Sequence, residues 1–527
     1  MPVPYLPGAP NSFHKCSLPP LVRIGYGQGG ILLRRSMPIF YSALMLTGVN
    51  LLLRMVSTSF QVFLSGRIGA AGIGLLQLVL SVGSLTMTAG IAGVRTATMY
   101  LTAEELGRKR PGNVIWVISG AMLYSLLFSC AVSVGLFYFA PWICDHWIGD
   151  QRALPALQLF ASFLPVCCMT GVMTGYFTAA NRIGTLAAVE VAEQMVSIAV
   201  TTAALVLWAG DDTERACMAV VGGSGAGACL TLLCLVLLRC RERSPIAPRI
   251  QMAHRLRQTA LPLAAADDLK AGINTAENLM VPKRLSLYTG CADPLALFGT
   301  VCGMVFPILM FPACILFGLT ELLIPELARC NAAGSRMRIR YLVRRSLRLA
   351  MIYGTVCGGI LYLCSDALCI GLYGSAEAGR YLGWFAALCG MLYCDIVTDA
   401  MIKGLGQQKA SVRYNIITSV MDLSLLFLLL PHFGIKGYFF SFALTHIINF
   451  GLSLRRLLKI TGQQVPWSVP LLTLSCGLGS VWVADHLTAP PLKALGFGCI
   501  FLCLLVLLKV VRKEELGWLR GLVRWNR

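Results

Sequence analysis

The chain is dominated by long apolar stretches that recur from about residue 38 to about residue 510. Each is close to the ~20 residues that an α-helix needs to cross ~30 Å of hydrocarbon. Of all residues 57% are hydrophobic and only 13% are charged, whereas a soluble domain usually carries roughly 25% charged residues. The sequence therefore predicts an all-α polytopic membrane protein, because a membrane β-barrel would instead alternate polar and apolar residues over strands of ~10 residues.

The apolar pattern predicts about fourteen transmembrane helices. We expect them at residues 38–64, 74–101, 114–140, 155–178, 184–208, 216–238, 259–282, 297–324, 347–370, 381–403, 413–431, 437–454, 467–485 and 492–510. A long basic loop after the sixth span divides the chain into two lobes of six helices followed by a final pair. Repeated halves of this kind are typical of transporters, whose site lies between the halves.

The expected organisation begins with residues 1–36, which are rich in proline and lack the apolar segment of a signal peptide. We expect this segment to be a cytoplasmic tail, or an over-extended start if translation begins at Met37. The remaining parts are a first lobe at 37–238, an inter-lobe loop at 239–256, a second lobe at 257–458, the last two helices at 459–511 and a basic cytoplasmic tail at 512–527.

The Lys and Arg residues that give the net charge of +20 are unevenly distributed among the connections between the spans. Lys and Arg cluster in every second connection between the spans, and the alternate connections are poor in basic residues. The basic set comprises 107–112, 239–249, 329–348, 403–413, 455–459 and the C-terminal tail. This alternation predicts that the basic loops and both termini face the cytoplasm. The positive charge is then explained by anionic membrane lipids, and nucleic acid is not an expected partner.

Polar side chains within the spans follow helical stripes. In the first span, Asn50, Arg54, Ser57 and Gln61 lie at i, i+4, i+7 and i+11, which places them on one face. A charged residue at the bilayer centre costs ~2.5–3.5 kcal/mol on insertion scales, so such faces usually line an interior cavity. The corresponding candidates in later spans are Asp267, Lys270, Asn274, Glu277, Asp395, Asp399 and Asp422. We therefore expect a water-filled cavity between the lobes.

The cations indicate the charge of the cargo. Arg54, Arg95 and Lys270 suit a phosphate or pyrophosphate group, because guanidinium and ammonium groups donate strong hydrogen bonds to it in a desolvated cavity. Two alternatives remain open: Asp267 and Lys270 can form a buried structural pair, and Arg95 can extend to the cytoplasmic headgroups. The sequence offers no nucleophile–base constellation, metal site or cofactor motif, so we expect the protein not to be an enzyme. The sequence does not determine the oligomeric state, and a monomer is the simplest expectation.

Three segments resemble a known family. They are FLSGRIGAAGIGLLQLVLSVGSLTMTAGIAGV (63–94), TGYFTAANRIGTLAAVEVAEQ (174–194) and LMVPKRL (279–285). They are similar to stage V sporulation protein B and its relatives, in the polysaccharide-exporter branch of the multidrug/oligosaccharidyl-lipid/polysaccharide (MOP) flippase superfamily. That superfamily also contains the MATE drug exporters and the MviN-type lipid II flippases.

The resemblance implies a MATE-like fold with two six-helix lobes that form a V and two added C-terminal helices. It also implies that the chain flips an undecaprenyl-pyrophosphate-linked saccharide or peptidoglycan precursor by alternating access, in spore or cell-wall synthesis. Arg54 matches the first-span arginine of the family. The further arginine of the MviN-type first span falls near Phe60 and is absent here, and only Arg95 stands near their paired arginines of span two.

Two other functions stay open at this point. The first is a cation-coupled drug exporter of the same fold, although the first two spans lack the acids that would bind cationic drugs. The second is a non-transporting membrane scaffold that recruits wall enzymes. In a transporter, the acids of spans seven, ten and eleven are candidates for coupling to H⁺ or Na⁺.

Overall fold

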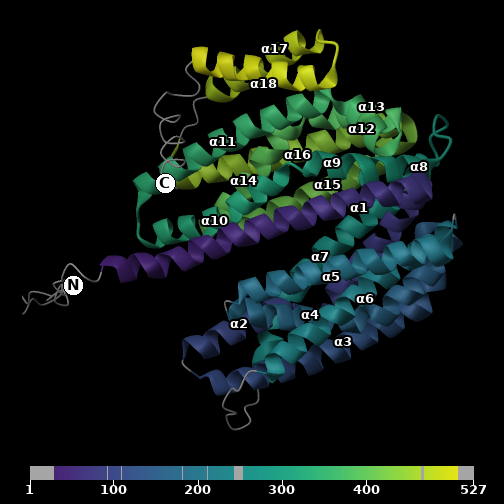
Figure 1. The fold of residues 1–527 in the computed structure, drawn as a ribbon, viewed down its shortest axis with the longest axis vertical. Helices are drawn as coiled ribbons and strands as arrows, with labels where there is room; N and C mark the ends of the chain where they lie inside the picture. Colours follow the sequence, from purple (N-terminus) through teal and green to yellow (C-terminus); the bar gives the residue numbers. More distant parts are fainter. Residues whose placement is uncertain are drawn as a thin grey trace, which may run out of the picture.

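The computed structural model describes residues 29–91, 93–108, 110–180, 182–210, 212–241, 253–463 and 468–508. In this part of the chain all regular structure is helical (Figure 1). The α-helices are α1 (Gly29–Ile91), α2 (Val94–Gly107), α3 (Val114–Ile143), α4 (Leu154–Ala179), α5 (Ile183–Ala204), α6 (Thr213–Cys240), α7 (Ala253–Leu285), α8 (Pro294–Gly299), α9 (Phe306–Met310), α10 (Ala313–Ala332), α11 (Arg336–Leu363), α12 (Ser365–Tyr373), α13 (Ala376–Ala386), α14 (Cys389–Gly404), α15 (Gln408–Phe433), α16 (Ile435–Thr461), α17 (Ser468–Asp485) and α18 (Pro490–Leu507). Short π-helical segments are η2 (Cys144–Ile148), η4 (Leu205–Ala209) and η5 (Thr300–Val305), and 3₁₀ turns are η1 (Pro111–Asn113) and η3 (Gln151–Ala153).

The helices form two groups, which Figure 1 shows one above the other. The first group contains α2 to α6, and the second contains α8 to α16, with the hairpin of α17 and α18 on its outer side. Helices α1 and α7 pack against members of both groups. The structure thus has two groups of helices, as the two-lobe fold predicts. The residue boundaries of the two lobes stay a prediction.

Helix α1 joins the first two predicted spans in one element of 63 residues. At 1.5 Å per residue, such an element is roughly three times the ~30 Å thickness of the hydrocarbon layer. Gly69 interrupts the helical geometry with φ 69° and ψ 179°, a conformation that residues other than glycine rarely adopt. The label α1 thus covers two helices that meet at a sharp kink at Gly69 and correspond to the first predicted span and most of the second. The first of them begins at Gly29, within the segment expected to be a tail.

Two predicted spans are bent. The eighth is divided between α8–α9 and α10 at an angle of 60°, and the tenth between α13 and α14 at 57°. At the first of these bends, Tyr393 donates a hydrogen bond to the carbonyl of Leu309 (2.8 Å) and Tyr353 donates one to the carbonyl of Pro312 (2.8 Å). A break in a helix exposes carbonyl groups that hydrocarbon cannot satisfy, and here two tyrosines satisfy them.

Nine helical stretches of the described residues are long and apolar enough to span a membrane, or up to eleven if each bent pair is one span. The predicted number of fourteen is therefore not confirmed. One reason is that the two segments of α1 and helix α2 form one candidate stretch, Leu51–Leu106. Another is that α7 carries several charged residues and does not qualify by composition. The inter-lobe loop and the C-terminal tail lie almost wholly outside the described residues.

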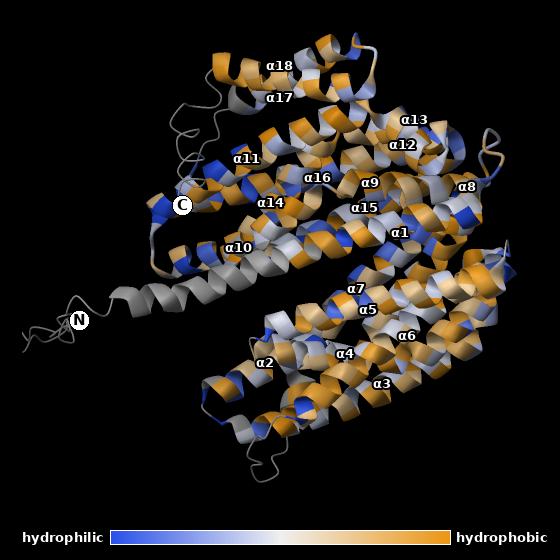
Figure 2. Ribbon diagram, viewed as in Figure 1, coloured by the Kyte–Doolittle hydropathy of each residue, from blue (hydrophilic) through white to orange (hydrophobic). Residues whose placement is uncertain are grey.

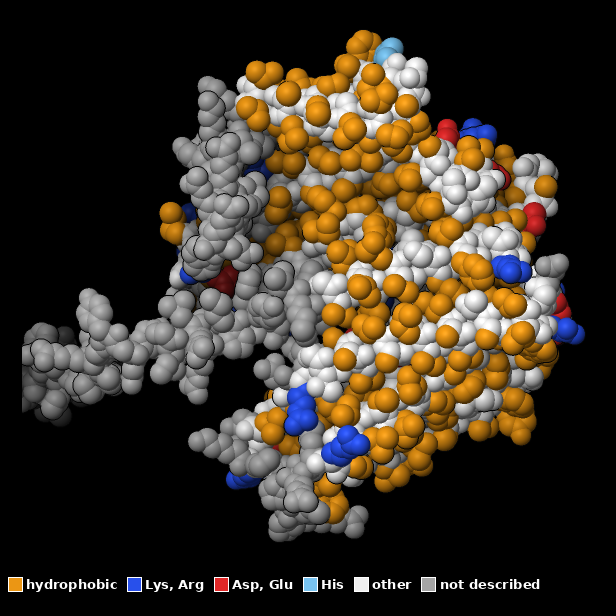
Figure 3. Space-filling model, viewed as in Figure 1, with side chains coloured by type: hydrophobic (Ala, Val, Ile, Leu, Met, Phe, Trp, Pro, Cys, Tyr) orange, Lys and Arg blue, Asp and Glu red, His pale blue; other side chains and the backbone are white. Residues whose placement is uncertain are grey.

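The surface of the helices is strongly apolar (Figures 2 and 3). Large side chains such as Leu207 (84% exposed), Tyr138 (76%) and Leu478 (73%) have no protein partner over most of their area. Soluble monomers rarely expose continuous apolar surface on this scale, so lipid is the solvent that covers it. The protein is a multi-pass membrane protein, as the composition predicts.

The connections fall at two opposite ends of the molecule. The turns between α2 and α3 and between α10 and α11 lie at one end, and α8 and α12 lie near the other (Figure 1). We call the first the basic end, because its turns belong to the Lys- and Arg-rich connections of the sequence. The opposite end is called the outer end. The cytoplasmic orientation of the basic end stays a prediction of the positive-inside rule.

Small residues bring α4, α5 and α6 together. A Cβ on Gly223 of α6 would lie 2.0 Å from Thr201 Oγ1 and 2.7 Å from the carbonyl oxygen of Ser197, both in α5, whereas a Cβ on the neighbouring Gly222 would meet only Leu159, at 3.6 Å. Glycine at position 223 thus allows two helix backbones to approach closely, as small residues do in membrane bundles.

We expect Gly223→Ala to lower the thermal stability of the purified protein. Alanine gains about 0.8–1 kcal/mol of helix propensity, but overpacking against the α5 backbone costs about 1–3 kcal/mol. Gly222→Ala is the matched control, with the same gain and room for the methyl group. Thermal unfolding in detergent measures both, and equal stability of the two variants would contradict the packing.

Candidate functional site

The two groups of helices meet at the outer end through backbone contacts. A Cβ on Gly74 of α1 would lie 2.3 Å from the carbonyl oxygen of Leu295 in α8, and a Cβ on Gly299 would lie 2.0 Å from the carbonyl oxygen of Ala70. Figure 1 shows the far ends of α2 and α10, at the basic end, well separated. The helices therefore converge at the outer end and diverge toward the basic end.

Side-chain hydrogen bonds strengthen the same junction. Gln61 of α1 donates from Nε2 to the carbonyl oxygen of Gly303 in the π-helical η5 (3.2 Å). Ser81 of α1 receives two bonds from α7: its carbonyl accepts from Thr275 (3.0 Å) and its hydroxyl accepts from Asn278 (3.0 Å). Gln61, predicted to line the cavity, thus contributes in this state to the contact between α1 and the second group.

Two adjacent cations at the end of α7 attach it to both groups. Lys283 donates a hydrogen bond from Nζ to the carbonyl oxygen of His146 in η2, beside α3. The guanidinium of Arg284 lies over the ring of Phe427 in α15, 3.2 Å from its centre, in a cation–π contact. Cations are rare in the base-poor outer connections, and these two are held by opposite groups. We call Lys283 and Arg284 the outer clasp.

We expect Lys283→Ala to open the outer end more often, because one link of the outer clasp is lost. Pairwise distances measured by electron spin resonance between labels at Leu207 and Lys436, on p-acetylphenylalanine so that native cysteines do not react, should gain a longer component. Lys493→Ala is the control, since Lys493 pairs with Asp485 in the α17–α18 hairpin, away from the outer clasp. An unchanged distance distribution in Lys283→Ala would contradict the role of the clasp.

The three predicted phosphate-binding cations lie on different helices with exposed side chains. Arg54 of α1 is close enough to Cys314 of α10 to interact electrostatically, and no carboxylate of the described residues pairs with it. Arg95 at the start of α2 is within electrostatic reach of Glu190 in α5. Lys270 is exposed on α7. Arg54 and Lys270 are thus on the two helices that touch both groups; a common phosphate site stays a prediction.

The polar face of α7 is exposed along much of its length. Asp267, Lys270 and Asn274 have exposed side chains, and the described residues show no ion pair between Asp267 and Lys270. The alternative of a buried Asp267–Lys270 pair is therefore not what the structure contains. Asn50 lies in α1, and its side chain is outside the described part of the molecule.

Glu277, on the same helix, is less exposed than Asp267, Lys270 and Asn274. Its carboxyl group lies within hydrogen-bonding reach of the carboxyl group of Asp422 in α15. Asp422 also accepts hydrogen bonds from Ser441 (2.6 Å) and Thr445 (3.3 Å) of α16. Two carboxylates this close repel each other unless a proton or a metal cation lies between them. The structure thus joins two of the predicted coupling residues, from spans seven and eleven, in one cluster.

Asp395 and Asp399 have different surroundings although they lie one turn apart on α14. Asp399 forms an ion pair with Lys403 (2.6 Å) and accepts a hydrogen bond from Ser411. Asp395 accepts a hydrogen bond from Asn449 Nδ2 (3.1 Å), and no cation of the described residues pairs with it. The charge of Asp399 is thus neutralised by Lys403, whereas Asp395 has an uncharged amide as its hydrogen-bond partner.

Helix α16 supplies site residues that we did not predict. Ser441, Thr445, Asn449 and Ser453 are all buried and follow one another at intervals of four residues. This regular stripe was visible in the sequence, and it contacts both acidic sites. No group of three or more His, Cys, Asp or Glu side chains in the described regions is arranged to hold a metal ion.

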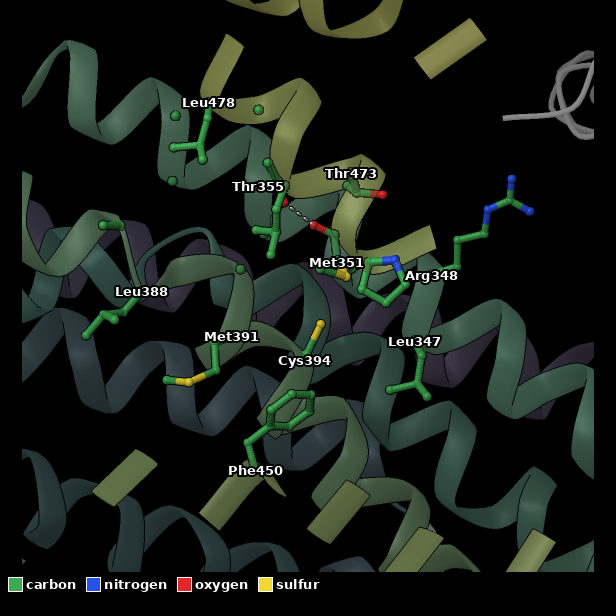
Figure 4. Close-up of a pocket in the computed structure, with 18 of the residues that line it drawn as sticks. Leu347, Arg348, Met351, Thr355, Leu388, Met391, Cys394, Phe450, Thr473 and Leu478 are labelled. Carbon is green, nitrogen blue, oxygen red and sulfur yellow. Dashed lines mark hydrogen bonds between the residues drawn. The ribbon is translucent and has the colours of Figure 1, made fainter. Parts of the chain in front are cut away.

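A cavity of about 1050 Å³ lies apart from these residues, between α17 and the helices α11, α14 and α16. Figure 4 shows Met351, Met391, Phe450 and Leu478 around it. Its wall is mostly apolar, with Arg344 and Arg348 near the N-terminal half of α11. Such a lining suits a hydrocarbon chain better than a saccharide, which needs many hydrogen-bond partners.

Comparisons with known proteins agree with this architecture. No family model matches the chain. The chain is similar to stage V sporulation protein B of Bacillus subtilis (strain 168), at 22% identity over 504 residues that cover 90% of this chain and 96% of that protein. Among solved structures, it resembles lipid II flippase MurJ in an inward closed conformation (TM-score 0.65, 11% identity, 88% of this chain and 98% of the other). It also resembles an inward-facing multidrug resistance MATE family transporter of the MOP superfamily (TM-score 0.60, 14% identity, 80% and 100%).

These likenesses confirm the resemblance and the fold class predicted from the sequence. The chain has the helical fold shared by a MATE family transporter and the lipid II flippase MurJ. At these identities the likenesses establish the fold alone.

Proposed function

We propose that this protein is a flippase of the bacterial cytoplasmic membrane that moves an undecaprenyl-pyrophosphate-linked oligosaccharide or peptidoglycan precursor by alternating access. The headgroup is taken up at the basic end, which faces the cytoplasm together with both termini. The outer contacts then release while the basic end closes, and the cargo leaves on the opposite side. The lipid-linked cargo of this proposal is supported by the likeness to MurJ, a lipid II flippase.

The observation that carries the proposal is the environment of Arg54. Its side chain is exposed on a membrane helix that touches both groups, and no carboxylate of the described residues forms an ion pair with it. A permanent positive charge within a membrane segment is costly unless water or an anionic ligand meets it. A pyrophosphate offers several oxygens to the planar guanidinium, with Lys270 and Arg95 as further donors.

We expect Arg54→Ala to reduce flipping of a fluorescent undecaprenyl-pyrophosphate disaccharide in proteoliposomes by at least about tenfold, since a charge-assisted hydrogen bond contributes about 1.5–3 kcal/mol. Arg67→Ala is the control on the same helix: Arg67 is also exposed, and it lies over Phe63 (5.9 Å) near the outer end. Full activity of folded Arg54→Ala would remove the arginine from the site. Export of cationic dyes, with no movement of the lipid, would favour the drug exporter.

We also propose that flipping is coupled to an inward flow of H⁺ or Na⁺ through the Glu277–Asp422 pair. The pair connects α7, which touches both groups, with α15 of the second group. Binding of a cation removes the repulsion between the carboxylates and lets the two helices stay together. Loss of the cation favours their separation, which is a physical link between ion occupancy and the position of α7.

We expect Glu277→Gln to abolish the dependence of flipping on a proton or sodium gradient, because the amide keeps the contact with Asp422 without a second charge. Asp267→Asn is the matched control on the exposed face of α7. The measurement is the flipping rate with and without each imposed gradient. A gradient response that persists in folded Glu277→Gln would place the coupling elsewhere.

A further inference from the structure

The cavity between α17 and the helices α11, α14 and α16 is too large to be left unfilled in a membrane. Its volume is about 1050 Å³, whereas packed protein interiors contain few voids larger than a water molecule. The residues that line it are mostly Leu, Gly, Met and Ala and include no Asp or Glu, so its wall offers few of the polar partners that hold water. The material that covers apolar protein surface within a bilayer is the hydrocarbon of lipids.

The two cations and the one amide of the lining lie at the basic end. Arg344 and Arg348 belong to the first half of α11, which follows the Arg-rich turn after α10, and Gln463 follows the end of α16. In Figure 4, Arg348 lies at one side of the view, and its guanidinium extends away from Met391. From Arg344 the lining continues along α11 as far as Tyr362, roughly 27 Å at 1.5 Å per residue. The space thus has cations at one end and a long apolar interior.

Gln463 presents a buried donor to this cavity. Its side chain is only 8% exposed, and no described residue accepts a hydrogen bond from its Nε2. A buried donor without an acceptor is costly. Arg344 is exposed at the same end, and no carboxylate of the described helices forms an ion pair with it. Two guanidinium groups and an amide donor fit a group that is negatively charged and accepts several hydrogen bonds, and an ionised phosphate has both properties.

We propose that the cavity holds one anionic glycerophospholipid of the bilayer as a permanent part of the fold. Its phosphate accepts hydrogen bonds from Arg344, Arg348 and Gln463, and an acyl chain extends between α17 and the apolar side chains of α14 and α16. The predicted cytoplasmic orientation of the basic end places this site in the leaflet that carries anionic lipids. The lipid completes the packing of α17, whose protein contacts with the second group lie chiefly on α11.

The position of the cavity separates this lipid from the cargo. The α17–α18 hairpin lies on the outer side of the second group, away from the first group (Figure 1). Within the described part of the chain, the lining includes no residue of α1 or α7, the helices that touch both groups. A molecule that crosses the membrane between the groups does not pass through this space. The inference goes beyond flipping and holds whatever cargo the protein carries.

The test is native mass spectrometry of the purified full chain with phosphatidylglycerol and phosphatidylcholine added in equal amounts. We expect the wild type to retain one phosphatidylglycerol and to bind it at least about tenfold more tightly than Arg344→Ala, which lacks a charge-assisted hydrogen bond. Gln463→Glu places a negative charge against the phosphate and should weaken binding at least as much. Arg329→Ala is the matched control, because it removes a charge at the same end while Glu326 keeps its ion pair with Arg338 (2.6 Å).

Met391→Trp provides an independent measurement, because it fills part of the apolar cavity and leaves the cations in place. The variant should lose the retained lipid, and phosphatidylglycerol should no longer raise its unfolding temperature as it does that of the wild type. Equal binding of the two phospholipids to the wild type, or unchanged binding in both Arg344→Ala and Met391→Trp, would overturn the proposal. Displacement of phosphatidylglycerol by an undecaprenyl-pyrophosphate lipid in a one-to-one ratio would also overturn it, since the cavity would then belong to the cargo.

Discussion

The architecture depends on the close backbone contact between α1 and the segment α8–η5 at the outer end. Glycines at positions 74 and 299 let main-chain atoms approach to distances that any Cβ would prevent. Few atoms separate the two backbones at this contact, and from it the two groups diverge toward the basic end (Figure 1). Gln61, Ser81 and the outer clasp then add polar links that are strong in a low-dielectric surrounding and can break one by one.

The candidate cations and two of the candidate acids lie in different parts of the structure. The side chains of Arg54 and Lys270 are exposed on the helices that touch both groups, where a ligand from outside the protein can meet them. The acids Asp395 and Asp422 instead lie inside the second group, each beside neutral donors of α16. A carboxylate can take up a proton when it is buried, whereas a guanidinium keeps its charge. The cations Arg54 and Lys270 and the acids Asp395 and Asp422 thus lie in different surroundings, although one acid, Asp267, is exposed on α7 as well.

Much of this was predictable from local sequence. Stretches of ~20 apolar residues determine a spanning helix wherever they occur, and the stripe that contains Arg54 needs only helical periodicity. The sharp kink at Gly69 was not predictable in detail, because the positive φ of this glycine reorients the chain without any loop between the two helices. Similarly, Gln61 bonds to Gly303, 242 residues away, and nothing local to either residue indicates that contact.

The two aspartates of α14 show most clearly where sequence reasoning ends. Asp395 and Asp399 have the same side chain, helix and face, and periodicity alone assigns them the same role. Their difference comes from partners brought by tertiary packing: Asp399 has Lys403 one turn ahead on its own helix, while Asp395 meets an amide of α16 that is 54 residues away. The charge of Asp399 is balanced by Lys403 as long as α14 is helical, whatever the neighbouring helices do. Asp395 instead depends on α16 for its hydrogen-bond partner, so its surroundings change whenever α14 and α16 move relative to each other.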